Sequence, residues 1–183
     1  MSNAHYFIGI EIPEHVREHL KELQEQLQVN KYFKKVSDFE DFHITLLFLG
    51  DWGKERERQM LWTALEARLK ESENFTLMLK NIGFFGKERF PRVIWADLEE
   101  QDNIFDLQEK ITDEADKFGF TREKRPYRPH ITLAKSYNTT EHYPVITNSL
   151  TPLLWQVKEV SLFKVLPGEK PMYKSVSKIC FSV

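Results

Sequence analysis

The chain has 183 residues, of which 41% are hydrophobic and 30% are charged, and its formal net charge is −2. These values predict one soluble globular domain, with an aromatic-rich core built from 14 Phe and 4 Trp. A slightly acidic chain is not a generic nucleic-acid coat, because such proteins are strongly basic. The single cysteine, Cys180, excludes an intramolecular disulfide and a cysteine-based zinc cluster, and its apolar surroundings predict a buried thiol.

No apolar run approaches the roughly 20 residues of a membrane-spanning helix. The N-terminal region also lacks the basic and apolar segments of a secretory signal. We therefore expect a cytoplasmic protein that does not enter a membrane, and a monomer.

Hydrophobic periodicity predicts alternating strands and helices along the chain. Apolar stripes with a 3.6-residue period indicate helices, and short β-branched or aromatic runs indicate strands. In chain order we expect a strand over 6–12, a helix over 13–28, a polar segment over 36–41, a strand over 42–49, a helix over 54–70, strands over 75–85 and 92–98, a helix over 101–118, a basic loop over 121–129, a strand over 130–136, a polar loop over 138–150, and a closing hairpin of 155–166 with 172–181.

The tetrapeptide His-Ile-Thr-Leu occurs twice, at residues 43–46 and 130–133. Both copies lie in expected strands, where alternate side chains point to the same face. His and Thr of each copy therefore share one face, and Ile and Leu share the other. The copies are about half a chain length apart, which indicates a duplicated architecture with one polar pair in each half.

The residues that flank each copy indicate which face is buried. In the first strand, Phe42, Ile44, Leu46 and Phe48 alternate with His43 and Thr45 and are expected to form a core face. In the second strand, Ile131 and Leu133 are expected to face the core, and His130, Thr132, Ala134 and Ser136 the wall of a cleft.

Two histidines and two threonines of this kind suit acid–base chemistry at a phosphate. Opening a cyclic phosphodiester requires a base that deprotonates water and an acid that protonates the leaving alkoxide. Imidazoles with ordinary pKa values near 6.5 serve in both roles at neutral pH, and the Thr hydroxyls donate hydrogen bonds to the non-bridging oxygens. For a single copy the alternative is a hydrogen-bonded structural histidine, whereas two matched copies favour the catalytic interpretation.

The segments 42–50 (FHITLLFLG) and 128–135 (RPHITLAK) resemble the two signatures of the 2H phosphoesterase superfamily. Within it the chain is most similar to the bacterial RNA 2′,3′-cyclic phosphodiesterases. The resemblance implies one 2H phosphoesterase domain over 1–183, with an α+β fold. It implies two intertwined lobes related by a pseudo-twofold axis, antiparallel sheets with helices packed outside, and a central cleft. Each lobe carries one motif, over 42–50 and 129–136.

The resemblance also implies roles for individual residues. His43 is expected to be the proton donor and His130 the proton acceptor, with Thr45 and Thr132 binding the substrate. The implied reaction is metal-independent and cofactor-free hydrolysis of RNA or oligonucleotide 2′,3′-cyclic phosphate ends to 2′-phosphomonoesters. Two alternatives stay open: a phosphodiesterase for small cyclic nucleotides such as ADP-ribose 1″,2″-cyclic phosphate, and a non-catalytic protein that binds RNA ends.

Lys135 stands where many relatives have Arg, five residues after the second His. A lysine offers a point charge to a phosphate without the bidentate fork of a guanidinium. Ideal strand alternation puts Lys135 on the face opposite His130, so it reaches the site only if the strand departs from regular alternation. We include Lys135 among the expected substrate-binding residues on that condition.

Three further patterns have competing interpretations. The basic segment 121–135, which contains Arg122, Lys124, Arg125, Tyr127 and Arg128, is either an RNA contact or a solvated loop. The same alternatives hold for the cluster of Lys31, Lys34 and Lys35 around Tyr32 and Phe33. The pattern His15-x-x-Glu18-His19 resembles a zinc motif, but no third ligand is evident, so we expect a solvent-facing helix there and no metal.

Overall fold

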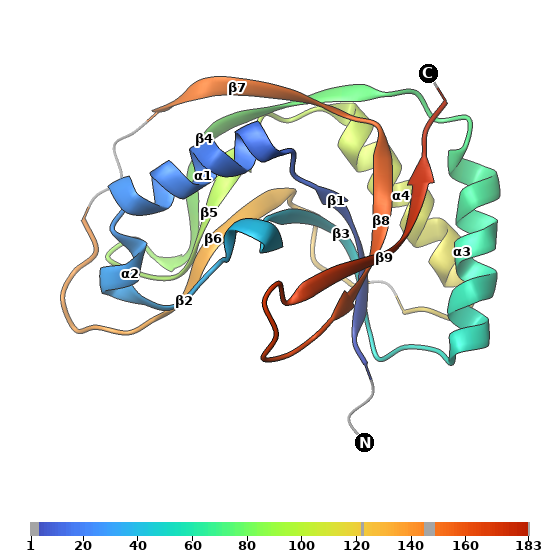
Figure 1. The fold of residues 1–183 in the computed structure, drawn as a ribbon, viewed down its shortest axis with the longest axis horizontal. Helices are drawn as coiled ribbons and strands as arrows, with labels where there is room; N and C mark the ends of the chain where they lie inside the picture. Colours follow the sequence, from blue (N-terminus) through green and yellow to red (C-terminus); the bar gives the residue numbers. More distant parts are fainter. Residues whose placement is uncertain (1–3, 122, 145–148, 183) are drawn as a thin grey trace.

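The computed structural model describes residues 4–121, 123–144 and 149–182 (Figure 1). Its elements in chain order are β1 (Tyr6–Glu11), α1 (Glu14–Gln26), α2 (Val29–Tyr32), β2 (Phe33–Val36), the 3-10 helix η1 (Phe39–Asp41), β3 (His43–Gly50), α3 (Glu55–Leu69), β4 (Phe75–Lys87), β5 (Phe90–Leu98), α4 (Asp102–Lys117), β6 (His130–Tyr137), β7 (Ser149–Val157), β8 (Glu159–Val165) and β9 (Tyr173–Cys180). Most of these elements match the strands and helices that periodicity predicts.

The strands form one antiparallel sheet in the order β7-β4-β5-β6-β3-β1-β8-β9, and β2 pairs with β6 beside this path. The two motif strands, β6 and β3, are the central pair, with Ile131 opposite Ile44. These two residues occupy the same position in the two motif copies, so the approximate twofold axis passes between them. The mixed fold and the sheet order confirm the predicted α+β class with duplicated antiparallel halves.

Helices α1 and α4 each cover the half of the sheet that does not contain the strand before them, whereas α3 packs in the same half as β3, the strand that precedes it. Helix α1 follows β1 but packs against β6, while α4 follows β5 but packs against β3, and α3 packs against β9. Figure 1 shows α1 and α2 beside β5 and β6, and α3 and α4 on the opposite side of the molecule. Gln24 of α1, fully buried, donates hydrogen bonds of 2.9 Å to the carbonyls of Ser37 and Leu133 and so ties α1 to the second motif strand.

Both motif strands contain a β-bulge at the same motif position. In β3 the pairing with β1 passes from Thr45 to Leu47, and in β6 the pairing with β5 passes from Thr132 to Ala134. The Leu of each motif, Leu46 or Leu133, is the extra residue. A bulge of this kind reverses the side-chain alternation beyond it. The position five residues after each His therefore returns to the face of the His.

The bulges change the faces on which side chains lie, relative to the sequence-based expectations. Phe48, expected in the core, is 55% exposed, while its neighbours Leu47 and Leu49 are buried. Ala134, expected on the cleft wall, is fully buried, and Ser136 has a φ of +64° at the point where regular strand geometry ends. Lys135 is exposed on the cleft side of β6.

Other differences concern elements that the periodicity does not resolve. The short elements α2 and β2 lie before the expected polar segment, which β2 enters only at Val36, and the register of β2 comes from its pairing with β6. The expected strand 155–166 is two strands that separate at Lys158, because Trp155 pairs with β4 and Val160 pairs with β9. Cys180 is exposed rather than buried, because its side chain is directed away from the core at the end of β9.

Within the residues that the structure describes, no helix is long and apolar enough to cross a lipid bilayer. Over the same ranges, no group of three histidine, cysteine or acidic side chains is arranged to hold a metal ion. His15 is exposed on α1, and the pattern with Glu18 and His19 gains no third ligand from the described part of the fold.

Candidate active site

The two motif histidines are fixed in the same way. His43 Nδ1 lies 2.7 Å from the carbonyl oxygen of Asp41, and His130 Nδ1 lies 2.8 Å from the carbonyl oxygen of Arg128. A carbonyl only accepts, so Nδ1 carries the proton in each ring. The neutral imidazoles therefore keep a lone pair on Nε2, and the charged imidazolium forms donate from Nε2. Both rings are set to exchange protons through the same nitrogen.

The central strand pair brings the two motifs together. With Ile44 opposite Ile131 in antiparallel strands, the same register sets His43 opposite Thr132 and Thr45 opposite His130. Thr45 and His130 line one cavity of about 690 Å³. The charges of His130 and Lys135 both act on the pKa of His43, so the three side chains lie within electrostatic reach. Four of the five expected site residues thus come from two facing positions on each strand.

His43 is enclosed by aromatic rings. The centroid of its ring lies 4.6 Å from that of Phe7, 4.8 Å from Tyr173 and 6.1 Å from Phe163. Burial among these rings is the largest influence on its pKa and lowers it, against a smaller upward effect of the hydrogen bond to Asp41. The positive charges of His130 and Lys135 also lower it, and the combined result is a pKa of about 4. His43 is consequently neutral at pH 7 in the free protein.

His130 has a more open environment. Its ring packs against Phe85 and Trp95, with centroids 5.5 and 5.6 Å away. Burial lowers its pKa, the Arg128 charge lowers it further, and the Arg128 carbonyl and the Asp97 carboxylate raise it. Arg128 lies over the Trp95 ring at 4.6 Å and 3.9 Å from Asp97, so its charge is partly balanced close to His130.

The two halves also differ in their threonines and cavities. His43 Nε2 lies 3.0 Å from Thr45 Oγ1, and among the described residues His130 has no matching contact with Thr132. The edge of His43 lines a separate cavity of about 220 Å³ with Asp41 and Tyr173, whereas His130 lines the large one. Thr45 links His43 to the large cavity, because its hydroxyl contacts His43 Nε2 and its side chain lines that cavity.

The large cavity contains part of the basic segment that the sequence analysis singled out. Arg125 and Arg128 line it, together with Phe48 and Phe85, while Glu123 pairs with Arg125 at 3.0 Å. Lys124 is exposed outside the lining, and Arg122 lies outside the described residues. The segment therefore contributes two cations to the cavity rather than a continuous basic stripe.

Several residues position the site through contacts that the sequence does not reveal. Asp41 and Arg128 act through backbone carbonyls two residues before each His. Every residue has such a carbonyl, so this role cannot be inferred from the identity of the residue. The Asp41 carboxylate accepts hydrogen bonds from the backbone N–H groups of Met172 and Tyr173, at 3.2 and 3.0 Å. Tyr127 donates from its hydroxyl to the Thr45 carbonyl at 3.0 Å, and burial raises its pKa.

Comparison with known proteins places this arrangement in a family. A model of the 2′-5′ RNA ligase superfamily matches residues 12–169. The chain belongs to the 2′-5′ RNA ligase superfamily. This membership confirms the 2H phosphoesterase resemblance that the two motifs carry.

Known relatives align with nearly the whole length of this chain. An RNA 2′,3′-cyclic phosphodiesterase of Bacillus subtilis (strain 168) is 29% identical over 179 residues, which are 97% of each chain. The crystal structure of TT0787 of Thermus thermophilus has a TM-score of 0.80 and 27% identity, covering 96% of this chain and 97% of that one. Escherichia coli LigT complexed with 3′-AMP has a TM-score of 0.79 at 20% identity, covering 98% and 99%, and shows the shared fold.

Proposed function

We propose that this protein is an enzyme that hydrolyses the 2′,3′-cyclic phosphate ends of RNA or oligonucleotides to 2′-phosphomonoesters. Superfamily membership and the name of the Bacillus subtilis relative support phosphodiester hydrolysis and RNA as the substrate class. The observation that carries the proposal is the pair of equivalent imidazoles on adjacent strands, each with Nδ1 bound to a carbonyl, so that Nε2 is the nitrogen that exchanges protons. A monomeric state and a cytoplasmic location stay predictions.

In the proposed reaction water attacks phosphorus while the bond from phosphorus to the ribose 3′-oxygen breaks. One Nε2 takes a proton from the water, and the other protonates the departing 3′-oxygen, so that a 2′-phosphate remains. The attacking and leaving oxygens of an in-line displacement lie on opposite sides of phosphorus. Two imidazoles related by a twofold axis suit that requirement, and each proton transfer is typically worth about 10²–10⁴ in rate.

Thr45, Thr132 and Lys135 are proposed to bind the phosphate. The threonine hydroxyls donate to the non-bridging oxygens, whose charge grows in the transition state. Lys135 adds a positive charge from the cleft side of β6, an orientation that the bulge at Leu133 provides. The cavity of about 690 Å³ next to Thr45 and His130 has room for the terminal nucleoside, and Phe48 offers an exposed ring on which a base can stack.

The proposed donor role of His43 requires a rise of its pKa when substrate binds. Its pKa of about 4 keeps it neutral in the free protein, and His130 has the milder environment. A phosphate anion beside Nε2 favours the charged imidazole, because opposite charges raise the pKa of a base. His43 then holds the proton that the leaving oxygen needs, and His130 stays the acceptor.

Turnover of a short RNA with a 2′,3′-cyclic end, in EDTA, tests the proposal. We expect a 2′-phosphate product, and a rate at least about 10²-fold lower in His43→Ala and in His130→Ala. Thr45→Ala and Thr132→Ala should lose less. Circular dichroism of each variant checks the fold. Near-normal turnover in either histidine variant contradicts the mechanism, and activity confined to ADP-ribose 1″,2″-cyclic phosphate favours the small-molecule alternative.

A substrate with sulfur in place of the bridging 3′-oxygen assigns the two roles. A thiolate leaves without a proton, so the variant that lacks the general acid regains rate on this substrate relative to the oxygen substrate. We expect this recovery in His43→Ala and not in His130→Ala. Recovery in His130→Ala alone would reverse the assignment.

A further inference from the structure

Strand β2 adds a second lysine to the site face of the sheet. Lys35 is the register partner of Lys135, and Phe33 is the partner of Tyr137. Register partners in an antiparallel pair share a face, with Cβ atoms about 4.5–5.5 Å apart. Because the bulge at Leu133 returns Lys135 to the face of His130, Lys35 lies on that face too. Lys34, one residue earlier, points to the other face and is also exposed.

The two partnered lysines carry like charges, and no acidic side chain of the described residues pairs with either. Neither Lys35 nor Lys135 has an ion-pair partner among the described residues. Other lysines of the protein do have such partners: Lys31 lies 2.9 Å from Glu141, and Lys178 contacts both Glu11 and Glu159. Like charges directly opposite on neighbouring strands destabilise a sheet. An anion shared between the two ammonium groups removes this cost.

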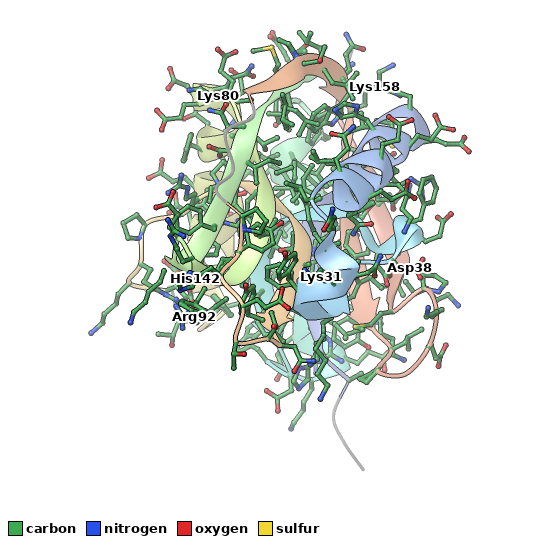
Figure 2. The ribbon with its side chains drawn as sticks, turned by 90° about the vertical axis from the view of Figure 1, so that its left-hand side faces the viewer. Lys31, Asp38, Lys80, Arg92, His142 and Lys158 are labelled. Atoms are coloured by element: carbon green, nitrogen blue, oxygen red, sulfur yellow. The ribbon has the colours of Figure 1, made fainter. Side chains whose placement is uncertain are left out.

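The lysine pair lies on two strands that are bonded to each other at the second motif. Ser37, at the end of β2, donates from its hydroxyl to the Thr132 carbonyl at 2.7 Å and from its N–H to the Leu133 carbonyl at 3.0 Å. These bonds fasten β2 to the second motif itself. The Lys135 charge reaches His43 and lowers its pKa. Figure 2 views the end of the molecule where β2 and α2 lie, with Lys31, Arg92 and His142 labelled around it.

This arrangement breaks the approximate twofold symmetry of the sheet. The residue that matches Lys135 in the first motif is Phe48, whose exposed ring carries no charge. Strand β2 pairs only with β6 and has no counterpart beside β3 in the described sheet. Of the two residues that lie five positions after the motif histidines, only Lys135 is charged, and it lies on the side of the axis where β2 pairs with β6.

We propose that Lys35 and Lys135 together form a phosphate site that holds the non-bridging oxygens of the cyclic phosphate. The inference rests on the proposed function and names Lys35 as a substrate-binding residue of that same site. Two point charges on facing strands supply the two donors that one guanidinium fork supplies to a phosphate. A neighbouring pair also keeps the anion between the strands, next to both histidines.

Binding of inorganic phosphate and turnover of a 2′,3′-cyclic substrate test the site on the full-length protein. Hydrogen bonds to charged groups are worth about 1.5–3 kcal/mol, so Lys35→Ala should weaken phosphate binding by about 10-fold or more, measured by calorimetry. The kcat/KM for the cyclic substrate should fall by a similar factor. Lys34→Ala is the matched control, because it removes the same charge from the same strand on the other face. It should change either quantity less than about 2-fold.

A rescue variant separates a phosphate site from a general effect of charge. Lys135→Arg in the Lys35→Ala background should recover most of the lost affinity, because the fork replaces the missing second donor. Equal effects of Lys35→Ala and Lys34→Ala, or no effect of either, would overturn the inference. If the wild type binds phosphate through Lys35 but does not hydrolyse cyclic ends, the proposed function fails and the phosphate site stands. If the protein hydrolyses cyclic ends and neither this activity nor phosphate binding depends on Lys35, the proposed function stands and the phosphate site fails.

Discussion

The burial of His43 should make the stability of the protein depend on pH. Its pKa is about 4 in the folded protein, where aromatic rings exclude water, and returns to its ordinary value near 6.5 on unfolding. Between these values the unfolded chain binds a proton that the folded protein does not, so stability falls as pH falls through this window. The difference between the two pKa values corresponds to about 3 kcal/mol of folding stability. This stability is fully present above about pH 6.5 and is lost near pH 4.

Urea unfolding at several pH values measures this effect in wild type and His43→Gln. Gln has no titrating group, so the variant lacks the proton-linked loss that His43 contributes. From about pH 7 to about pH 4 the wild type should lose about 3 kcal/mol more than the variant. His15→Gln, at an exposed position on α1, controls for the loss of a histidine as such. Parallel curves for wild type and His43→Gln, or an NMR titration of His43 centred near pH 6.5, would refute the reasoning.

Three further outcomes follow from the geometry. The pKa values of His43 and His130 are both lowered, so the bell-shaped pH profile of kcat/KM should have its maximum below about pH 6.5; a maximum above about pH 7 would contradict the burial of the pair. Gly83→Ala should destabilise the fold by about 1–3 kcal/mol in urea, because its Cβ would lie 2.3 Å from the fully packed Trp95 ring; an unchanged midpoint would show that the ring moves. Tyr127→Phe should lose about 1 kcal/mol by the same assay, because the Thr45 carbonyl loses its 3.0 Å donor, and an unaltered stability would mean that water replaces it.

The repeated motif and the hydrophobic periodicity predict much of this protein. His43 and His130 are identified by a pattern that needs only local alternation, since a strand determines which side its next residues face over a short distance. The helices α1, α3 and α4 are similarly visible, because an apolar stripe every 3.6 residues reflects burial against any partner. Superfamily membership confirms what the two motif segments indicate.

Alternation fails where a second strand imposes a bulge. Phe48 and Lys135 lie on the face opposite to the one that period-two counting gives them, because β1 and β5 pair past Leu46 and Leu133. No local signal in the motif distinguishes a regular strand from a bulged one. The position of the extra residue depends on the register of partner strands that are distant in sequence.

The paired His-Ile-Thr-Leu strands and the alternation of strands and helices can be read from the residues alone, and with them the class of fold and the chemistry to expect. Three features depend on the folded chain: Lys35 lies opposite Lys135, the carbonyls of Asp41 and Arg128 hold the histidine rings, and aromatic rings lower the His43 pKa. The difference arises because periodicity records only whether a side chain is buried. The register, the bulges and the electrostatic surroundings come from which distant residues bury it.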